Sequence, residues 1–294
     1  MRLNKKILKN GSILLILLTI ICIGLQWHLR LREPVFIKSY AQYLIDSEND
    51  SVEFPIQYIT NRDKSSFMWN ISFVEHPELN VNVNYSPTMF PSFSYVGENE
   101  EIVDLYKIQT VYVTINNVSD LDLKNLNLNK AVVSFSDSST MEVDLGQIEL
   151  IQYEYKEGGL STFSVSGSNQ GDTSVSYEAN KKIYLTSIIN PYSEILGESL
   201  TLKILGDLWS YQLPCTYEVN LKNFVLQPEE TITVYSFLDV SNEKELKYAN
   251  IDIRPLFIYQ DEQGRTFEEI INNINYSPYF NNWWDVYQFI KESR

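Results

Sequence analysis

The sequence predicts a mainly β protein, in which an N-terminal transmembrane helix is followed by two antiparallel β-sandwich domains of immunoglobulin-like architecture and a short C-terminal helix. Three observations support this prediction. Residues 13–25 are almost entirely apolar. Many short segments between residues 52 and 260 alternate apolar and polar side chains, as strands with one buried face do. A stretch rich in Gly and Ser, residues 158–173, interrupts this alternation.

Composition and charge restrict the class of protein. The chain has 294 residues, 44% hydrophobic and 21% charged, which is typical of a folded protein with a buried core. The net charge is −15, but the first 32 residues contain six basic residues and no acidic one. Removing these six from the 23 basic residues leaves 17 against 38 acidic ones, so the body from Glu33 onward carries −21. Such a surface repels phosphate backbones, and we expect no nucleic-acid partner.

Residues 1–10 are expected to form a basic cytoplasmic tail and residues 11–28 a transmembrane anchor. Gly11–Trp27 corresponds to about 25 Å of helix at ~1.5 Å per residue, the short end of the range for a membrane span. A cleaved signal peptide is the alternative. However, the sequence LQWHLR after the apolar run lacks the small residues that a signal peptidase needs. Cys22 follows two isoleucines, unlike the modified cysteine of a lipoprotein.

The charges on either side of this segment predict its orientation. Four basic residues precede it, whereas Arg30 and Arg32 follow it with Glu33 beside them. The positive-inside rule places the amino terminus in the cytoplasm and the body from Glu33 outside. The sequence therefore predicts a single-pass protein of the cell membrane, whose C-terminal body is extracytoplasmic.

Residues 29–50 are expected to form a helical connector. Pro34 suits the first helical position, where its missing N–H would have no partner in any case. Four apolar or aromatic residues have the spacing of one helix face: Phe36, Tyr40, Tyr43 and Leu44. The polar run DSEND then ends the predicted helix.

Residues 51–157 are expected to form the first β-sandwich domain. The segment FMWNISFV predicts a strand with one face occupied by Phe67, Trp69, Ile71 and Phe73. The segment LNVNVNY alternates more clearly, because Leu79, Val81, Val83 and Tyr85 are separated by three asparagines. Further strands are predicted around residues 111–115, 141–145 and 148–155.

Residues 158–173 are interpreted as a Gly/Ser-rich junction, and residues 174–294 as the second β-sandwich domain with its C-terminal helix. The alternative is that the Gly/Ser-rich stretch belongs to a long hairpin inside one larger domain. In the sequence NNWWDVYQFIKESR, one helix face contains Trp283, Val286, Tyr287 and Ile290. Asn282 is suited to cap the amino end of this helix, and Asp285 lies in its first turn.

No catalytic, cofactor-binding or metal-binding residue is assigned from the sequence. The body contains one histidine, His76, in a predicted turn before a proline, and one cysteine, Cys215, which is expected to be a small buried hydrophobe. One His and one Cys cannot complete a tetrahedral zinc site. The segment DEQGRTFEE lacks the regularly spaced acids of a calcium loop and is typical of a hairpin turn around Gln263. A weak calcium site at a domain junction is the alternative.

The aromatic residues near the carboxyl end are the most distinctive candidate binding site. The candidates are Tyr276, Tyr279, Phe280, Trp283, Trp284 and Tyr287. Exposed aromatic faces can stack on sugar rings or form the centre of a protein interface. The alternative is structural: the terminal helix packs its aromatic side chains onto the second β-sandwich domain.

These features together predict a membrane-anchored, extracytoplasmic, non-catalytic binding or interaction protein of a bacterial cell surface. Its expected partners are the membrane, through the single N-terminal span, and a protein or a cell-wall polymer. A lone cysteine in the exported body excludes an internal disulfide there, which suits a bacterial surface. The alternatives are a cell-wall hydrolase with a carboxylate-based site and an accessory subunit of a membrane transporter or sensor.

Overall fold

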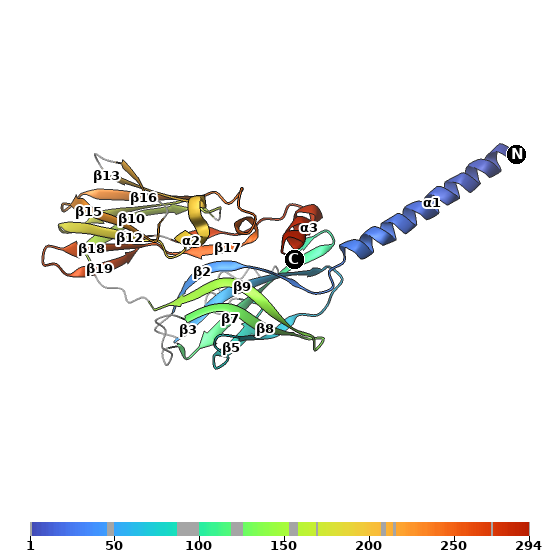
Figure 1. The fold of residues 1–294 in the computed structure, drawn as a ribbon, viewed down its shortest axis with the longest axis horizontal. Coiled ribbons are helices and arrows are strands. Elements are labelled where there is room, and N and C mark those ends of the chain that lie inside the picture. The colour runs from blue at the N-terminus through green and yellow to red at the C-terminus, as the bar shows by residue number, and fades with distance from the viewer. Residues whose placement is uncertain are drawn as a thin grey trace.

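The protein is mainly β, with several antiparallel sheets and one N-terminal apolar helix (Figure 1). In this computed structural model the described residues are 2–45, 50–86, 100–118, 126–152, 158–168, 170–206, 210–213, 216–271 and 273–293. The sheets form two pairs, here called the anchor-proximal and anchor-distal pairs because only the first adjoins the N-terminal helix (Figure 1).

Helix α1 (Arg2–Leu29) leaves the body as a free rod, with the amino terminus at its far end (Figure 1). Its segment Lys9–Leu29 is long and apolar enough to cross a membrane, and none of its most apolar window is buried against the body. Signal sequences share this length and composition. The large apolar side chains of this segment, from Ile13 to Trp27, are exposed by 48–83%.

The anchor-proximal pair consists of sheets A and B. Sheet A contains β1 (Val35–Ile37), β3 (Ser51–Asn61), β5 (Asn80–Asn84), β6 (Glu100–Val103) and β7 (Tyr106–Asn116). Sheet B contains β2 (Ser39–Leu44), β4 (Met68–Phe73), β8 (Leu126–Phe135), β9 (Thr140–Ile151), β17 (Asn250–Ile253) and β20 (Ile274–Tyr276). Buried side chains from both sheets, such as Phe54 and Phe73, form one core between them.

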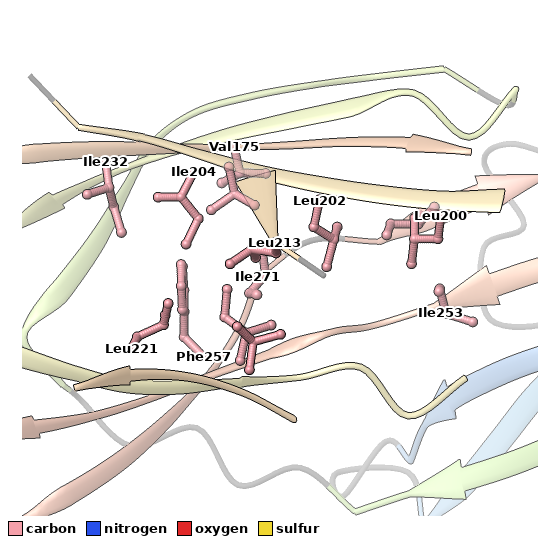
Figure 2. Close-up of a cluster of buried hydrophobic side chains, with 14 of the residues drawn as sticks. Val175, Leu200, Leu202, Ile204, Leu213, Leu221, Ile232, Ile253, Phe257 and Ile271 are labelled. Atoms are coloured by element: carbon pink, nitrogen blue, oxygen red, sulfur yellow. The ribbon is translucent and has the colours of Figure 1, made fainter. Parts of the chain in front are cut away.

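The anchor-distal pair consists of sheets C and D. Sheet C contains β10 (Leu160–Gly167), β11 (Thr173–Ala179), β13 (Leu200–Gly206), β14 (Ser210–Leu213) and β16 (Thr231–Leu238). Sheet D contains β12 (Ile183–Ile189), β15 (Glu218–Leu226), β18 (Leu256–Asp261) and β19 (Thr266–Ile270). Figure 2 shows their shared core, where Val175 and Ile204 of sheet C face Phe257 of sheet D.

Four short helices connect or follow the strands in the described part of the body. They are α2 (Ser193–Leu196), η4 (Gly197–Ser199), η5 (Leu246–Tyr248) and α3 (Trp283–Glu292). Helix α3 confirms the predicted C-terminal helix and its cap, because the Asn282 side chain accepts hydrogen bonds from the backbone N–H groups of Trp284 and Asp285. The predicted turn after Asp261 is also present, between β18 and β19.

The prediction of a helical connector over residues 29–50 is wrong, because its described part contains strands β1 and β2. Strand β2 pairs in parallel with β9 on one side and with β17 on the other. Its residues Ser39–Ala41 are all buried, so the strand shows no alternation of apolar and polar side chains. A strand buried on both faces resembles a buried helix in its hydrophobic pattern, and the partners that decide between them lie about 100 or more residues away.

The predicted face of β4 is partly wrong. Ile71 and Phe73 are buried as expected, but Phe67 and Trp69 are exposed by 46% and 59%, and Met68 is buried in their place. The pairing of β4 with β8 shifts register between Met68 and Asn70. A bulge of this kind inserts one residue and reverses which side chains face the core on either side of it.

The Gly/Ser-rich stretch at residues 158–173 contains strand β10, which forms a hairpin with β11. These residues therefore include a strand of a hairpin, and whether they separate two domains or lie inside one larger domain stays a prediction. The sheets do not follow chain order, since β17 and β20 come from the last 45 residues and pair within sheet B. The two ends of the body consequently meet in the anchor-proximal pair.

The two pairs of sheets are joined by buried polar contacts as well as by the chain. Tyr192, which directly precedes α2, is 1% exposed. Its hydroxyl donates to the carbonyl of Ala41 in β2 at 2.9 Å and lies 3.3 Å from the carbonyl of Gln147 in β9. Burial raises the pKa of this phenol, so the hydroxyl remains a hydrogen-bond donor. This contact holds the segment between β12 and α2 against two strands of sheet B.

Candidate binding surfaces

The six predicted aromatic residues do not form one surface. Phe280 is buried, with 3% of its surface exposed, whereas Tyr279 and Trp284 are exposed by 69% and 50%. Tyr276 is partly buried in β20, where its hydroxyl donates to the carbonyl of Lys247. The aromatic rings therefore divide into a structural group and an exposed group.

The structural group fixes α3 to the body. The ring of Phe280 stacks on Tyr248 at 5.8 Å and contacts Phe289 at 5.7 Å between ring centroids. We call this buried group the α3 cluster; it consists of Leu31, Ile37, Ile59, Val103, Tyr106, Ile108, Tyr248, Phe280, Val286, Phe289 and Ile290. Its members on β1, β3 and β7 belong to sheet A. The expectation that α3 packs onto the second β-sandwich domain is therefore wrong, because the helix packs onto sheet A beside the end of α1 (Figure 1).

The exposed group surrounds the first turns of α3. Trp284 contacts both Trp283 and Tyr287, with ring centroids 5.5 Å apart in each case. Tyr287 also approaches His28 in the last turn of α1, with 3.4 Å between its hydroxyl and Nε2. These rings lie beside the N-terminal helix, a position that the sequence did not indicate because the two segments are about 260 residues apart.

A groove of about 710 Å³ lies on the other side of α3 and was not predicted. Its walls come from four separate segments: the start of β1, the start of β9, the loop before η5 and the end of α3. Apolar side chains on its surface are Val35, Phe36, Met141, Val143, Tyr248 and Phe289. No signal in the sequence identifies this groove, because its residues come together only when β17, β20 and α3 return to the anchor-proximal pair.

The groove is strongly acidic. Five carboxylates line it, Glu33, Glu142, Asp144, Glu245 and Glu292, together with two lysines, Lys38 and Lys244. Lys38 is paired with Asp144 at 2.8 Å. Among the described residues, no ion pair neutralises the remaining four carboxylates. The groove therefore combines apolar contact area with excess negative charge.

Asp144 is a poor candidate for a proton donor. Desolvation raises the pKa of its carboxyl. Hydrogen bonds from Lys38 and from the N–H of Gly146 lower the pKa, and together with the charge of Lys38 they outweigh desolvation, so the pKa lies below its ordinary value. The pKa of Lys38 is raised by the same hydrogen bond, against the opposing effect of burial. This pair stays ionised at neutral pH, which suits ion pairing rather than general acid catalysis.

An edge strand lies beside the groove. Strand β1 pairs only with β3 among the described strands, and Val35 and Phe36 of β1 line the groove. An unpaired strand edge presents backbone donors and acceptors that an extended segment can use. The groove thus places apolar and ionic side chains beside an edge strand.

The other candidate residues stay apart from the groove. His76 is partly buried, with 27% of its side chain exposed, and its Nδ1 lies 3.1 Å from Glu78 Oε1. Asp261 Oδ1 accepts from the N–H groups of Gln263 and Arg265, which explains the hairpin turn. Cys215 lies outside the described residues, and within those residues no three metal-ligating side chains gather.

No family model matches the chain, and no curated protein matches it. Solved structures resemble it weakly. A protein of unknown function from Porphyromonas gingivalis W83 is 9% identical over 83% of this chain and 99% of that chain, with a TM-score of 0.22. The Enterococcus faecalis MSCRAMM ACE, described as binding its ligands by the collagen hug model, is 9% identical over 85% and 95%, with a TM-score of 0.23. The secreted serine protease VesC from Vibrio cholerae is 9% identical over 84% and 52%, with a TM-score of 0.22. Similarities this weak support no argument about function.

Proposed function

We propose that the protein is a membrane-anchored, extracytoplasmic, non-catalytic interaction protein of a bacterial cell surface, built on two immunoglobulin-like β-sandwiches. Its partner binds in the acidic groove between β1, β9 and α3. The observation that carries this proposal is the combination of an apolar surface beside an edge strand with four carboxylates that form no ion pair within the described part of the chain. These features favour a protein segment with cationic side chains in an extended conformation over a neutral wall polymer.

The groove adjoins the segment that leaves α1, since Glu33 and Pro34 line it. A partner bound there would lie close to the membrane surface, where other membrane proteins expose their juxtamembrane segments. Membrane proteins also carry basic residues in their extracytoplasmic segments. A short cationic stretch of such a partner is complementary in charge to the acidic groove. The proposed role is therefore to hold a second surface protein beside this one.

Charge reversal in the groove tests this proposal. The full chain is reconstituted in zwitterionic lipid nanodiscs, and binding is measured with a fluorescent peptide of alternating Lys and Val, with empty nanodiscs as background. We expect the peptide to bind the unchanged chain at least about tenfold more tightly than it binds the Glu142→Lys, Glu245→Lys double variant.

A matched control is Glu178→Lys with Glu194→Lys, two carboxylates outside the residues that line the groove. It changes the net charge by the same amount and should leave binding nearly unchanged. A peptide of alternating Glu and Val should not bind the unchanged chain. Equal affinity of the cationic peptide for both double variants, each folded by circular dichroism, would contradict the proposal.

Cellular fractionation tests the anchor and its orientation. We expect the full chain to stay in the membrane pellet after an alkaline carbonate wash, because about 31 Å of apolar helix is stable in a bilayer. Protease added outside intact cells or spheroplasts should degrade the body and leave only the basic tail and span protected. Release by carbonate, or full protection of the body, would oppose the anchor or its predicted orientation respectively.

A further inference from the structure

The end of α1 passes directly into the sheet. Leu31 is buried, its N–H donates to Asn61 Oδ1 at 2.9 Å, and its carbonyl accepts from Asn61 Nδ2 at 2.7 Å. The carbonyl of Leu29 accepts from the Tyr106 hydroxyl at 2.7 Å. Asn61 and Tyr106 are paired with each other across β3 and β7. The end of the helix and the residue two positions after it are therefore hydrogen-bonded to two paired strands of sheet A.

The length of the apolar segment sets its depth. Lys9–Leu29 contains 21 residues, and at ~1.5 Å per residue it is about as long as the hydrocarbon layer is thick, about 30 Å. With this segment across the bilayer, Trp27 and His28 lie where the hydrocarbon meets the headgroups. Tyr287 approaches the ring of His28, so the first turns of α3 lie at the same level.

Aromatic and apolar side chains gather at this level. They are the exposed Trp27, His28, Leu105 and Trp284 and the partly buried Tyr287, here called the aromatic pole. Trp27 and Leu105 line one shallow depression, and the neighbouring Asp104 accepts from the N–H of Trp283 at the start of α3. Trp27, Leu105 and Trp284 are exposed by 83%, 39% and 50%. Three separate segments thus place such side chains around the base of α1.

The charged side chains that line this depression are balanced, unlike those of the acidic body. Arg30 is paired with Asp63 at 2.8 Å, and Arg62 and Asp104 line the same depression. The depression therefore neither repels nor strongly attracts an anionic surface. Tryptophan and tyrosine rings are stable among lipid headgroups because one end of the ring is apolar and the other forms hydrogen bonds.

We propose that the aromatic pole is a second membrane contact, in which Trp284 and Tyr287 of α3 enter the headgroup layer beside Trp27. The partner is the zwitterionic headgroup region of the bilayer in which α1 is anchored. This contact would hold the body in one orientation. The acidic groove, on the other side of α3, would then stay at a constant distance from the membrane surface. The inference depends on the proposed membrane anchor.

Tryptophan fluorescence in vesicles tests this contact. The full chain is reconstituted in phosphatidylcholine vesicles, with or without bromine atoms near the headgroup end of the acyl chains, and single-tryptophan variants are made by replacing the other tryptophans with phenylalanine. We expect brominated lipid to quench the variant that retains Trp284 and the variant that retains Trp27. A variant whose only tryptophan comes from Phe163→Trp, on exposed β10 in the anchor-distal pair, should not be quenched.

The outcomes separate this inference from the anchor itself. Quenching of Trp27 without quenching of Trp284 would overturn the aromatic pole and leave the anchor in place. Absence of quenching for both would overturn the anchor and the inference together. If a single-tryptophan variant does not fold, Trp284→Ala in the otherwise unchanged chain gives the same information. This substitution should reduce the quenching of tryptophan emission by brominated lipid. The control substitution Trp69→Phe should reduce that quenching less.

Discussion

Gly146→Ala is expected to lower the free energy of unfolding by about 2–5 kcal/mol, the sum of a left-handed backbone cost and a steric cost. Gly146 lies in β9 at φ +91°, and a Cβ there would come 2.5 Å from the carbonyl oxygen of Ser39. Ser39 is the residue paired with Gly146 in the parallel ladder of β2 and β9. Because the obstacle is backbone, the strands must separate to accommodate a methyl group. Chemical denaturation of the full chain in nanodiscs measures the loss.

Gly264→Ala is the matched control for this substitution. Gly264 also has a positive φ, +75°, but a Cβ there would contact no atom within 4 Å. It should cost only the backbone component, about 1–2 kcal/mol. The difference between the two variants therefore isolates the close approach of β2 and β9. If Gly146→Ala proves no more costly than Gly264→Ala, the parallel pairing of Ser39 with Gly146 is incorrect.

Phe280→Ala is expected to lower the free energy of unfolding by about 3–5 kcal/mol, the usual cost of deleting a buried phenyl ring. The ring is 3% exposed, stacks on Tyr248 and contacts Phe289, so its removal leaves a cavity in the α3 cluster. We expect α3 to lose its contact with sheet A before the sheets unfold. Hydrogen exchange at residues 283–292 and denaturant unfolding measure the two effects separately.

Tyr279→Ala is the control, because the neighbouring ring is 69% exposed. It should change the free energy of unfolding by less than about 0.5 kcal/mol. Comparable destabilisation by the two substitutions would mean that Phe280 does not anchor the helix. The groove and the aromatic pole each include residues of α3. Phe280→Ala should therefore disturb both surfaces, whereas Tyr279→Ala should leave α3 in place.

Local patterns predicted the elements whose stabilising contacts are close in sequence. The exposed leucines and isoleucines of α1, the cap formed by Asn282 and the turn after Asp261 all depend on neighbouring residues. The alternating valines of β7, Val111 and Val113, were likewise buried as expected, because a strand with one wet face shows its orientation directly.

Predictions failed where distant partners decided the structure. Residues 39–44 have side chains that fit a helix face, but they form a central strand because β9 and β17 pair with both of its edges. The bulge in β4 exchanged Trp69 for Met68 in the core, and this shift depends on the register of β8. The groove was missed for the same reason. Its four segments are far apart in the sequence, and only the fold brings them together.

The amino-acid sequence alone determined that an apolar helix precedes a strongly acidic, strand-rich body with an aromatic C-terminal helix, because hydrophobic period, charge and capping are local properties. Tertiary structure alone decided where that helix packs. Its residues Val286 and Phe289 are buried against sheet A and its Trp284 is exposed beside α1, since β17 and β20 complete sheet B and bring the carboxyl end back to the start of the body. Burial of apolar surface between segments more than 200 residues apart selects this arrangement, and no short window of sequence contains both partners.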